Sequence, residues 1–210
     1  VEDKWNDNPG IKLNDLFALF GDPSLRLPVV PFPNGVWDDD IHLGNNMVID
    51  NGDTLIINAG INVELDENVS ITVNPGGCLI AEGTADHPIT FTKAESNDWN
   101  CIKFSTSTSC GSSLKHCIIE NATYGIYLTG NGSNIEHLVV DSCSFDNCYY
   151  GVYANNSYFD LINSTIENCD YRGIYLVSCG AGKVLFDSDT IRSNGTYGTI
   201  YDNGIALTSS

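Results

Sequence analysis

Tyrosine residues recur at a fixed place in three similar stretches of the chain, and they are its best candidates for contact with a ligand. In each stretch a glycine is followed by Ile or Val, then Tyr, then Leu or Ala, as in residues 125–128. The alternation of a β-strand predicts that this tyrosine points outward while its two neighbours point inward. The expected outward column is Lys103, Tyr127, Tyr153 and Tyr175, and a second column beside it is Tyr124, Tyr150 and Arg172.

An aromatic column of this kind can stack on sugar rings, and a neighbouring Lys or Arg adds a cation–π contact. The residue types therefore predict a face that can bind a polysaccharide. The alternative is that the tyrosines only stabilise the outer side of a sheet by packing on one another. The sequence leaves both interpretations open.

The eight cysteines stand at positions 78, 101, 110, 117, 143, 148, 169 and 179, and none forms a Cys-x-x-Cys zinc motif. Cys117 and Cys143 occupy the same place in consecutive repeats, as do Cys148 and Cys169. Coils about 4.8 Å apart fall within the Cα separation that a disulfide allows, so bridges Cys117–Cys143 and Cys148–Cys169 are one expectation. Stacked free thiols are the other, because free cysteine packs as a small hydrophobic residue.

Catalytic patterns are weak in this chain. The repeats contain few Lys and Arg residues, and none forms a cluster with paired acids; the four His residues show no metal-ligand spacing. We therefore expect no enzyme activity and no cofactor, with Ca²⁺ as the one metal that stays open. The acid-rich segments that can bind Ca²⁺, or can simply be solvated, are Asp38–Asp40, Asp50 with Asp53, Asp66 with Glu67, and Asp187 with Asp189.

Charge excludes two classes of partner. The 210 residues include 27 acidic and 9 basic ones, which gives a formal net charge of -18. Nucleic acids and anionic membrane surfaces require a basic footprint, so neither is expected as a partner. No apolar run approaches the ~18 residues of a membrane span, so membrane insertion is not expected.

The elements that must position these side chains are revealed by an internal repeat. Phrases that begin at Ile119, Phe145 and Ile166 share the order apolar, acid, Asn, then Tyr-Gly or Arg-Gly, and a looser copy runs from Ile191 to Leu207. A period of about 22 residues predicts a solenoid. Aligned on the glycine, the copies give apolar columns and an Asn column at residues 121, 147 and 168, which is what parallel coils of one chain produce. Residues 35–210 are therefore predicted to form an all-β, single-stranded parallel β-helix of roughly seven or eight coils.

Residues 1–34 differ from the rest and are predicted to be a connector or cap. The segment Asn14–Phe20 has the pattern of a short helix with Asn14 as its N-cap and Gly21 after its end. Four prolines between residues 23 and 33 then prevent regular structure.

The repeated Ile-x-Asn-x-x-x-Gly-Ile-x-Leu phrase resembles the right-handed parallel β-helix repeat proteins, and the lead-in through Gly77–Thr84 and Trp99–Phe104 is similar to secreted bacterial members. Cys101 stands where that pattern usually has Gly. The resemblance implies a right-handed coil and covers about four fifths of the chain. Residues 16–27 (Leu-Phe-Ala-Leu-Phe-Gly-Asp-Pro-Ser-Leu-Arg-Leu) resemble the end of gingipain-type cysteine peptidase domains, which gives no activity to this chain.

Together these features favour a non-catalytic extracellular or cell-surface structural module, cut from a longer precursor, that can stack end to end into fibres. The expectation of stacking comes from the last residues, 204–210, which continue the repeat without a closing element. The alternatives are a polysaccharide-binding module that uses the tyrosine column, or a fragment of a polysaccharide lyase or hydrolase.

Overall fold

The computed structural model describes residues 32–105, 111–130, 138–179, 184–195 and 200–203. Within these residues the chain forms twenty-one short strands and no helix. The expected helix at Asn14–Phe20 and most of the expected connector, residues 1–34, lie outside this part, so both stay predictions. The first strand, β1, begins at Gly35.

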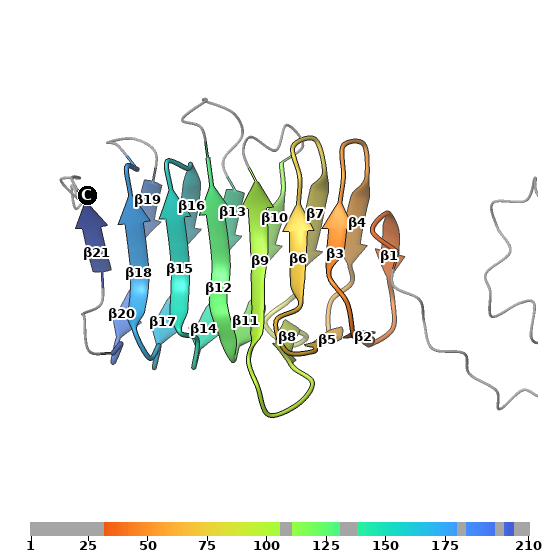
Figure 1. The fold of residues 1–210 in the computed structure, drawn as a ribbon, viewed down its shortest axis with the longest axis horizontal. Helices are drawn as coiled ribbons and strands as arrows, with labels where there is room; N and C mark the ends of the chain where they lie inside the picture. Colours follow the sequence, from red (N-terminus) through yellow and green to blue (C-terminus); the bar gives the residue numbers. More distant parts are fainter. Residues whose placement is uncertain (1–31, 106–110, 131–137, 180–183, 196–199, 204–210) are drawn as a thin grey trace, which may run out of the picture. The chain divides into compact units, whose positions relative to one another are not determined.

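Every third strand along the chain joins the same sheet, and all neighbouring strands pair in parallel (Figure 1). This is the predicted parallel β-helix. The first sheet contains β1 (Gly35–Trp37), β4 (Thr54–Ile57), β7 (Cys78–Glu82), β10 (Ser113–Lys115), β13 (Leu138–Asp141), β16 (Phe159–Ile162) and β19 (Val184–Asp187). The second contains β2 (Ile41–Leu43), β5 (Asn62–Leu65), β8 (Ile89–Lys93), β11 (Cys117–Glu120), β14 (Ser144–Asp146), β17 (Thr165–Glu167) and β20 (Thr190–Arg192). The third contains β3 (Met47–Ile49), β6 (Ser70–Val73), β9 (Trp99–Ser105), β12 (Ala122–Thr129), β15 (Tyr150–Asn155), β18 (Arg172–Val177) and β21 (Ile200–Asn203).

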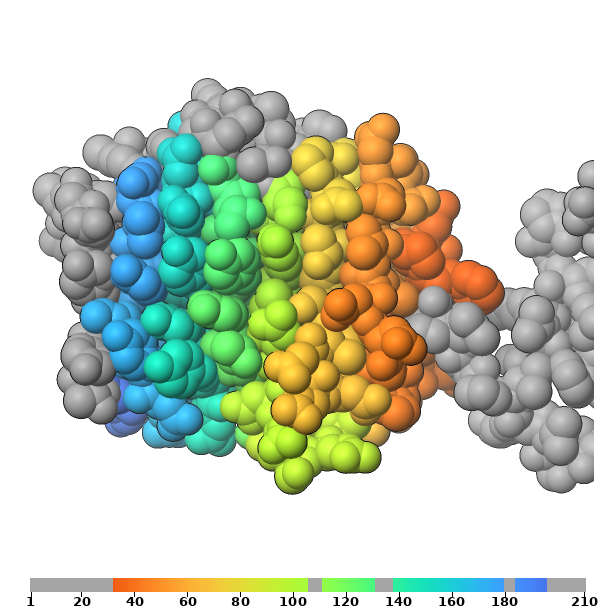
Figure 2. Space-filling view, viewed as in Figure 1, coloured from red at the N-terminus to blue at the C-terminus, as the bar shows by residue number. Residues whose placement is uncertain are grey.

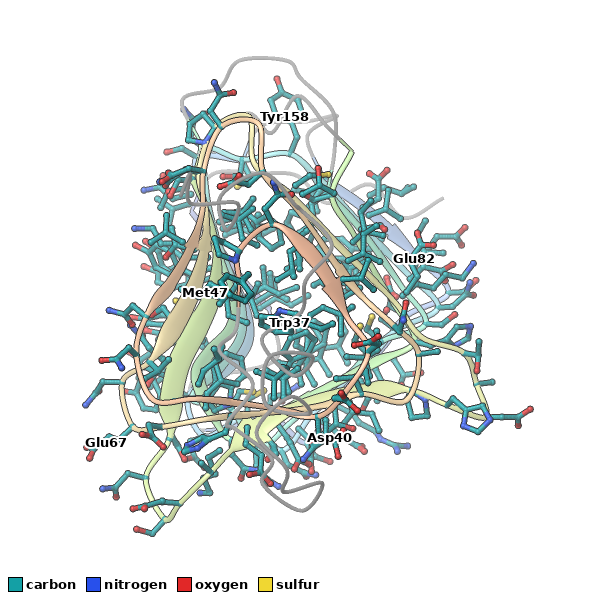
Figure 3. The ribbon with its side chains drawn as sticks, turned by 90° about the vertical axis from the view of Figure 1, so that its right-hand side faces the viewer. Trp37, Asp40, Met47, Glu67, Glu82 and Tyr158 are labelled. Atoms are coloured by element: carbon teal, nitrogen blue, oxygen red, sulfur yellow. The ribbon has the colours of Figure 1, made fainter. Side chains whose placement is uncertain are left out.

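The three sheets enclose one apolar core, which Figure 3 shows end-on with Trp37 inside it. The core is built from columns because in-register parallel pairing places the same repeat position of each turn over the last. Ile119, Phe145, Ile166 and Ile191 form one such column by backbone register, as the repeat predicts. The first three of these side chains are fully buried.

The Asn column marks the corner between the second and third sheets. Asn121, Asn147, Asn168 and Ser193 have φ angles of 58°, 52°, 55° and 54°. Asn tolerates this left-handed conformation better than other residues with a side chain, because its short polar group can bond locally. The column therefore exists chiefly for backbone geometry, and the amides of Asn147 and Asn168 donate to Asp146.

Five cysteines come directly after residues with a positive φ angle and are buried: Cys117, Cys143, Cys148, Cys169 and Cys179. The seven described cysteines are buried, and neither Cys117–Cys143 nor Cys148–Cys169 is bridged. The thiols of these four residues donate to backbone carbonyls instead: that of Cys143 lies 3.4 Å from both Leu114 O and Asp141 O. Side chains in register on parallel coils keep their Cβ atoms about 4.8 Å apart, beyond the roughly 3.5–4.5 Å that a disulfide needs. Cys110 lies outside the described residues.

Two details of the predicted alignment are wrong. The repeat predicts that the looser fourth copy runs to Leu207 and that its Gly204 and Ile205 match Gly173 and Ile174, but Ile200 is the residue that pairs with Ile174. Cys101 was placed opposite a glycine, but it pairs with Tyr124. Both corrections concern residues around the glycine of the repeat, where the third sheet is irregular.

Candidate functional site

A glycine bulge lets two tyrosines of each turn face the same side of the third sheet. Tyr124 and Tyr127 are three residues apart, so in a regular strand they would point to opposite faces. Pairing between β9 and β12 shifts by one residue between Tyr124 and Ile126, and Gly125 is the extra residue. A bulge of this kind re-aims the side chains around it. Gly151 and Gly173 repeat the arrangement in β15 and β18.

No residue larger than glycine fits at Gly125 or Gly151. A Cβ atom at Gly151 would lie 2.6 Å from the carbonyl oxygen of Gly173 and 2.6 Å from Ile166 Cγ2. Gly125 has the same relation to the carbonyl oxygen of Gly151, also at 2.6 Å. The glycine column thus lets consecutive turns approach each other closely, and it sets the direction of the tyrosines on either side of it.

The tyrosines stack in two rows on the outside of this sheet. The rings of Tyr127 and Tyr153 are parallel within 4° with centroids 4.8 Å apart, and those of Tyr124 and Tyr150 are parallel within 5° at 5.0 Å. Tyr175 continues the first row and meets Tyr153 edge to face at 5.2 Å. The register predicted from the repeat is therefore correct for both rows, and the backbone of Tyr201 continues the first one.

Two further tyrosines belong to the same cluster. Tyr149 and Tyr171 lie in consecutive turns just before β15 and β18, and their rings stack at 5.1 Å. Tyr171 also meets Tyr150 edge to face at 5.1 Å. We call the whole cluster the tyrosine face; Figure 2 views the molecule from the side of the third sheet that carries it. Its members are Tyr124, Tyr127, Tyr149, Tyr150, Tyr153, Tyr171 and Tyr175 with Lys103 and Arg172.

The sequence reasoning missed Tyr149 and Tyr171. They precede the strands, so the alternation that identified Tyr127, Tyr153 and Tyr175 does not apply to them. The signal that was present is their shared place two residues before Gly151 and Gly173.

Two cations lie at opposite ends of the tyrosine face. Lys103 Nζ is 5.8 Å from the ring centroid of Tyr127, and the Arg172 guanidinium is 5.3 Å and 5.2 Å from the rings of Tyr171 and Tyr175. Arg172 is buried beneath the rings, whereas Lys103 is partly exposed. The tyrosines are partly exposed too, and Tyr149 is the most open of them at 42%.

Packing of the rings changes how readily they ionise. Burial raises the pKa of Tyr124, Tyr127 and Tyr153 above the ordinary value of 10, and neighbouring tyrosines add to the effect. The pKa of Tyr150 rises to about 12, first through burial and then through Tyr171 and Tyr124. The face therefore presents neutral phenols at physiological pH.

A Tyr150→Phe variant is expected to change how stability depends on alkaline pH. Since the folded pKa of about 12 exceeds the unfolded value of 10, the neutral phenol contributes stability below pH 10 that is lost as pH rises through about 12. Wild type should therefore lose stability more steeply than the variant between these two values. Urea unfolding across this window, with tyrosinate absorbance recorded in parallel, measures it. Equal slopes for both proteins contradict the assignment.

The metal-binding and cysteine chemistry considered from the sequence is not assembled in the described residues. No group of three or more His, Cys, Asp or Glu residues there is placed to hold a metal ion. Burial raises the pKa of Cys148 well above its ordinary value and that of Cys169 to about 12, which disfavours the reactive thiolate. Binding of Ca²⁺ at the acid-rich segments, one of the two alternatives that the sequence left open, stays a prediction.

The second sheet carries a column of carboxylates, Glu120, Asp146 and Glu167, on consecutive turns. Closely spaced carboxylates are used by glycosidases. Here each one is already engaged: Thr92 donates to Glu120 at 2.8 Å, Asn168 donates to Asp146 at 2.7 Å, and Arg192 donates to Glu167 at 2.8 Å. We assign this column a structural role.

Comparison with known proteins bears on the fold and leaves the site unassigned. A family model described as "right handed beta helix region" matches residues 53–210. Neither the curated proteins nor the solved structures gave a match. Among the described residues no helix is long and apolar enough to span a membrane.

Proposed function

Because the chain belongs to the right-handed β-helix family, whose stacked turns present flat outer sheets, we propose that it is a non-catalytic module that binds a polysaccharide across its tyrosine face. One observation carries the proposal. The stacked rows of Tyr127 with Tyr153 and of Tyr124 with Tyr150 form a partly exposed aromatic surface on consecutive turns. Aromatic faces of this kind stack on the apolar faces of sugar rings.

Two features favour a binding role over mere packing of the sheet. The cluster extends beyond the strands to Tyr149 and Tyr171, and a cation lies against the aromatic rings at each end. Tyrosine combines a large, rigid contact area with a polar hydroxyl, which suits a surface that must contact both the faces and the hydroxyls of a sugar. Stabilising the sheet alone would require neither the added tyrosines nor the partly exposed Lys103.

We place the module outside the cell or on its surface, as part of a longer protein. The acidic composition and the likeness of residues 16–27 to the end of gingipain-type peptidase domains support this location. End-to-end assembly into fibres, the leading expectation from the sequence, depends on residues 204–210. These lie outside the described part, so assembly stays a prediction for electron microscopy.

The proposal is tested by titrating the intact chain with soluble glycans in a calorimeter. The probes are cellohexaose, an alginate hexasaccharide and a heparin hexasaccharide. We expect at least one to bind with a Kd between about 1 μM and 1 mM, corresponding to roughly -8 to -4 kcal/mol. We also expect no new reducing ends and no unsaturated sugars after long incubation. Absence of heat with all three probes, or release of cleaved product, refutes this function.

A further inference from the structure

Carboxylates are distributed unevenly over the three sheets. The strands of the first sheet carry Glu82, Asp141, Asp160 and Asp187, and those of the second carry Glu64, Glu120, Asp146 and Glu167. The third sheet has no Asp or Glu in any described strand from β3 to β18. The last strand of that sheet, β21, contains Asp202. In a chain of net charge -18, the six strands of the third sheet from β3 to β18 are therefore free of carboxylates.

The only ionised side chains within those strands of the third sheet are cations. Lys103 lies in β9 and Arg172 in β18, and both touch tyrosine rings. The turns that lead into these strands do carry acidic residues, among them Asp98, which is paired with Lys93 at 3.1 Å, and Asp170, which is exposed. The tyrosine face thus has a positive local charge on an otherwise negative molecule.

We propose that the glycan bound by the tyrosine face is anionic, an inference that rests on the proposed polysaccharide binding. Lys103 and Arg172 are three turns apart in the stack, roughly 14 Å at the usual strand spacing. A glycan chain that runs along the helix axis crosses Tyr127, Tyr153 and Tyr175 in order, with a cation near each end. A carboxylate or sulfate group of the glycan then meets the partly exposed Lys103, and its rings stack on the tyrosines, while the buried Arg172 adds positive charge behind them.

The remaining surface adds selectivity. An anionic chain is repelled by the acidic first and second sheets and accepted only at the third, so the net charge orients binding. A neutral glycan has no such preference. Charge, rather than ring contact alone, is therefore expected to select the ligand.

The test compares wild type, Lys103→Gln and the matched control Lys115→Gln, which removes a cation from the first sheet. Each is titrated with the alginate, heparin and cellohexaose probes at low and high salt. We expect the alginate or heparin probe to bind at least about tenfold tighter than cellohexaose at low salt, and added salt to weaken only the anionic probes. Lys103→Gln should reduce affinity for the anionic probe about five- to tenfold. The variant should reduce affinity for cellohexaose less than affinity for the anionic probe, and Lys115→Gln should behave as wild type.

Each negative outcome of this test refutes a different part of the proposal. If cellohexaose binds as tightly as the anionic probes, and Lys103→Gln changes nothing, the anionic preference is wrong while glycan binding stands. If no glycan binds, the proposed function fails as well. Tighter binding of a thymidine oligonucleotide than of either anionic glycan also overturns the inference, because stacked rings and cations can bind single-stranded nucleic acid.

Discussion

Gly151→Ala is expected to lower the free energy of unfolding by about 3 kcal/mol, the upper part of the usual range for overpacking. The added methyl group would lie 2.6 Å from both the Gly173 carbonyl oxygen and Ile166 Cγ2, and neither can move away without separating two turns. For a chain of this size the midpoint of thermal unfolding should fall by roughly 6–12 °C. Circular dichroism on heating measures the change.

Gly44→Ala is the matched control. Its added Cβ atom meets only the terminal carboxylate oxygen of Asp66, at 3.3 Å, and that side chain is partly exposed and can shift. We expect its unfolding midpoint to stay within about 2 °C of wild type, as is usual for surface substitutions. If Gly151→Ala unfolds like this control, the glycine column does not determine how closely the turns approach.

The double variant Tyr127→Ala/Tyr153→Ala is expected to reduce glycan affinity at least about 100-fold, since a buried aromatic anchor typically contributes 2 kcal/mol or more. These two rings form the best-stacked pair of the first row, 4.8 Å apart and 4° from parallel. Removing them opens the centre of the tyrosine face while Tyr124 and Tyr150 remain. Calorimetric titration with the tightest-binding probe measures the loss.

Two companion variants distinguish the contribution of the aromatic rings to glycan binding from their contribution to folding. Tyr127→Phe/Tyr153→Phe keeps both rings and should retain most of the affinity, whereas Tyr158→Ala, which removes a tyrosine outside the face, should match wild type. Circular dichroism spectra must show the same β-structure in all three proteins. Unchanged affinity in a folded double-alanine variant means that the tyrosines serve the sheet alone.

Much of this molecule could be predicted from its repeat. In-phase columns have one simple physical origin, parallel turns in register, so the order Lys103, Tyr127, Tyr153, Tyr175 followed directly from aligning the copies. The outward direction of these tyrosines followed from strand alternation. These are local rules, and the chain obeys them through the middle of the helix.

The features that could not be predicted from the sequence depart from those local rules. The fourth copy was misaligned because residues 204–205 repeat the Gly-Ile pair of residues 125–126 and 173–174, whereas the strand that pairs with β18 begins at Ile200. For the two cysteine pairs the sequence left disulfides and stacked free thiols open, because the choice depends on the Cβ separation, which parallel side chains hold too wide for a bridge. The uneven distribution of carboxylates appears only once the strands are sorted into sheets.

The most direct test of the account is to locate the bound glycan by NMR. Backbone amide shifts of the isotope-labelled chain should be recorded during titration with the tightest-binding hexasaccharide. The account predicts that the largest changes fall on β9, β12, β15 and β18 and on the turns that carry Tyr149 and Tyr171. Changes centred on the first or second sheet, for example around the Glu120, Asp146 and Glu167 column, would contradict it.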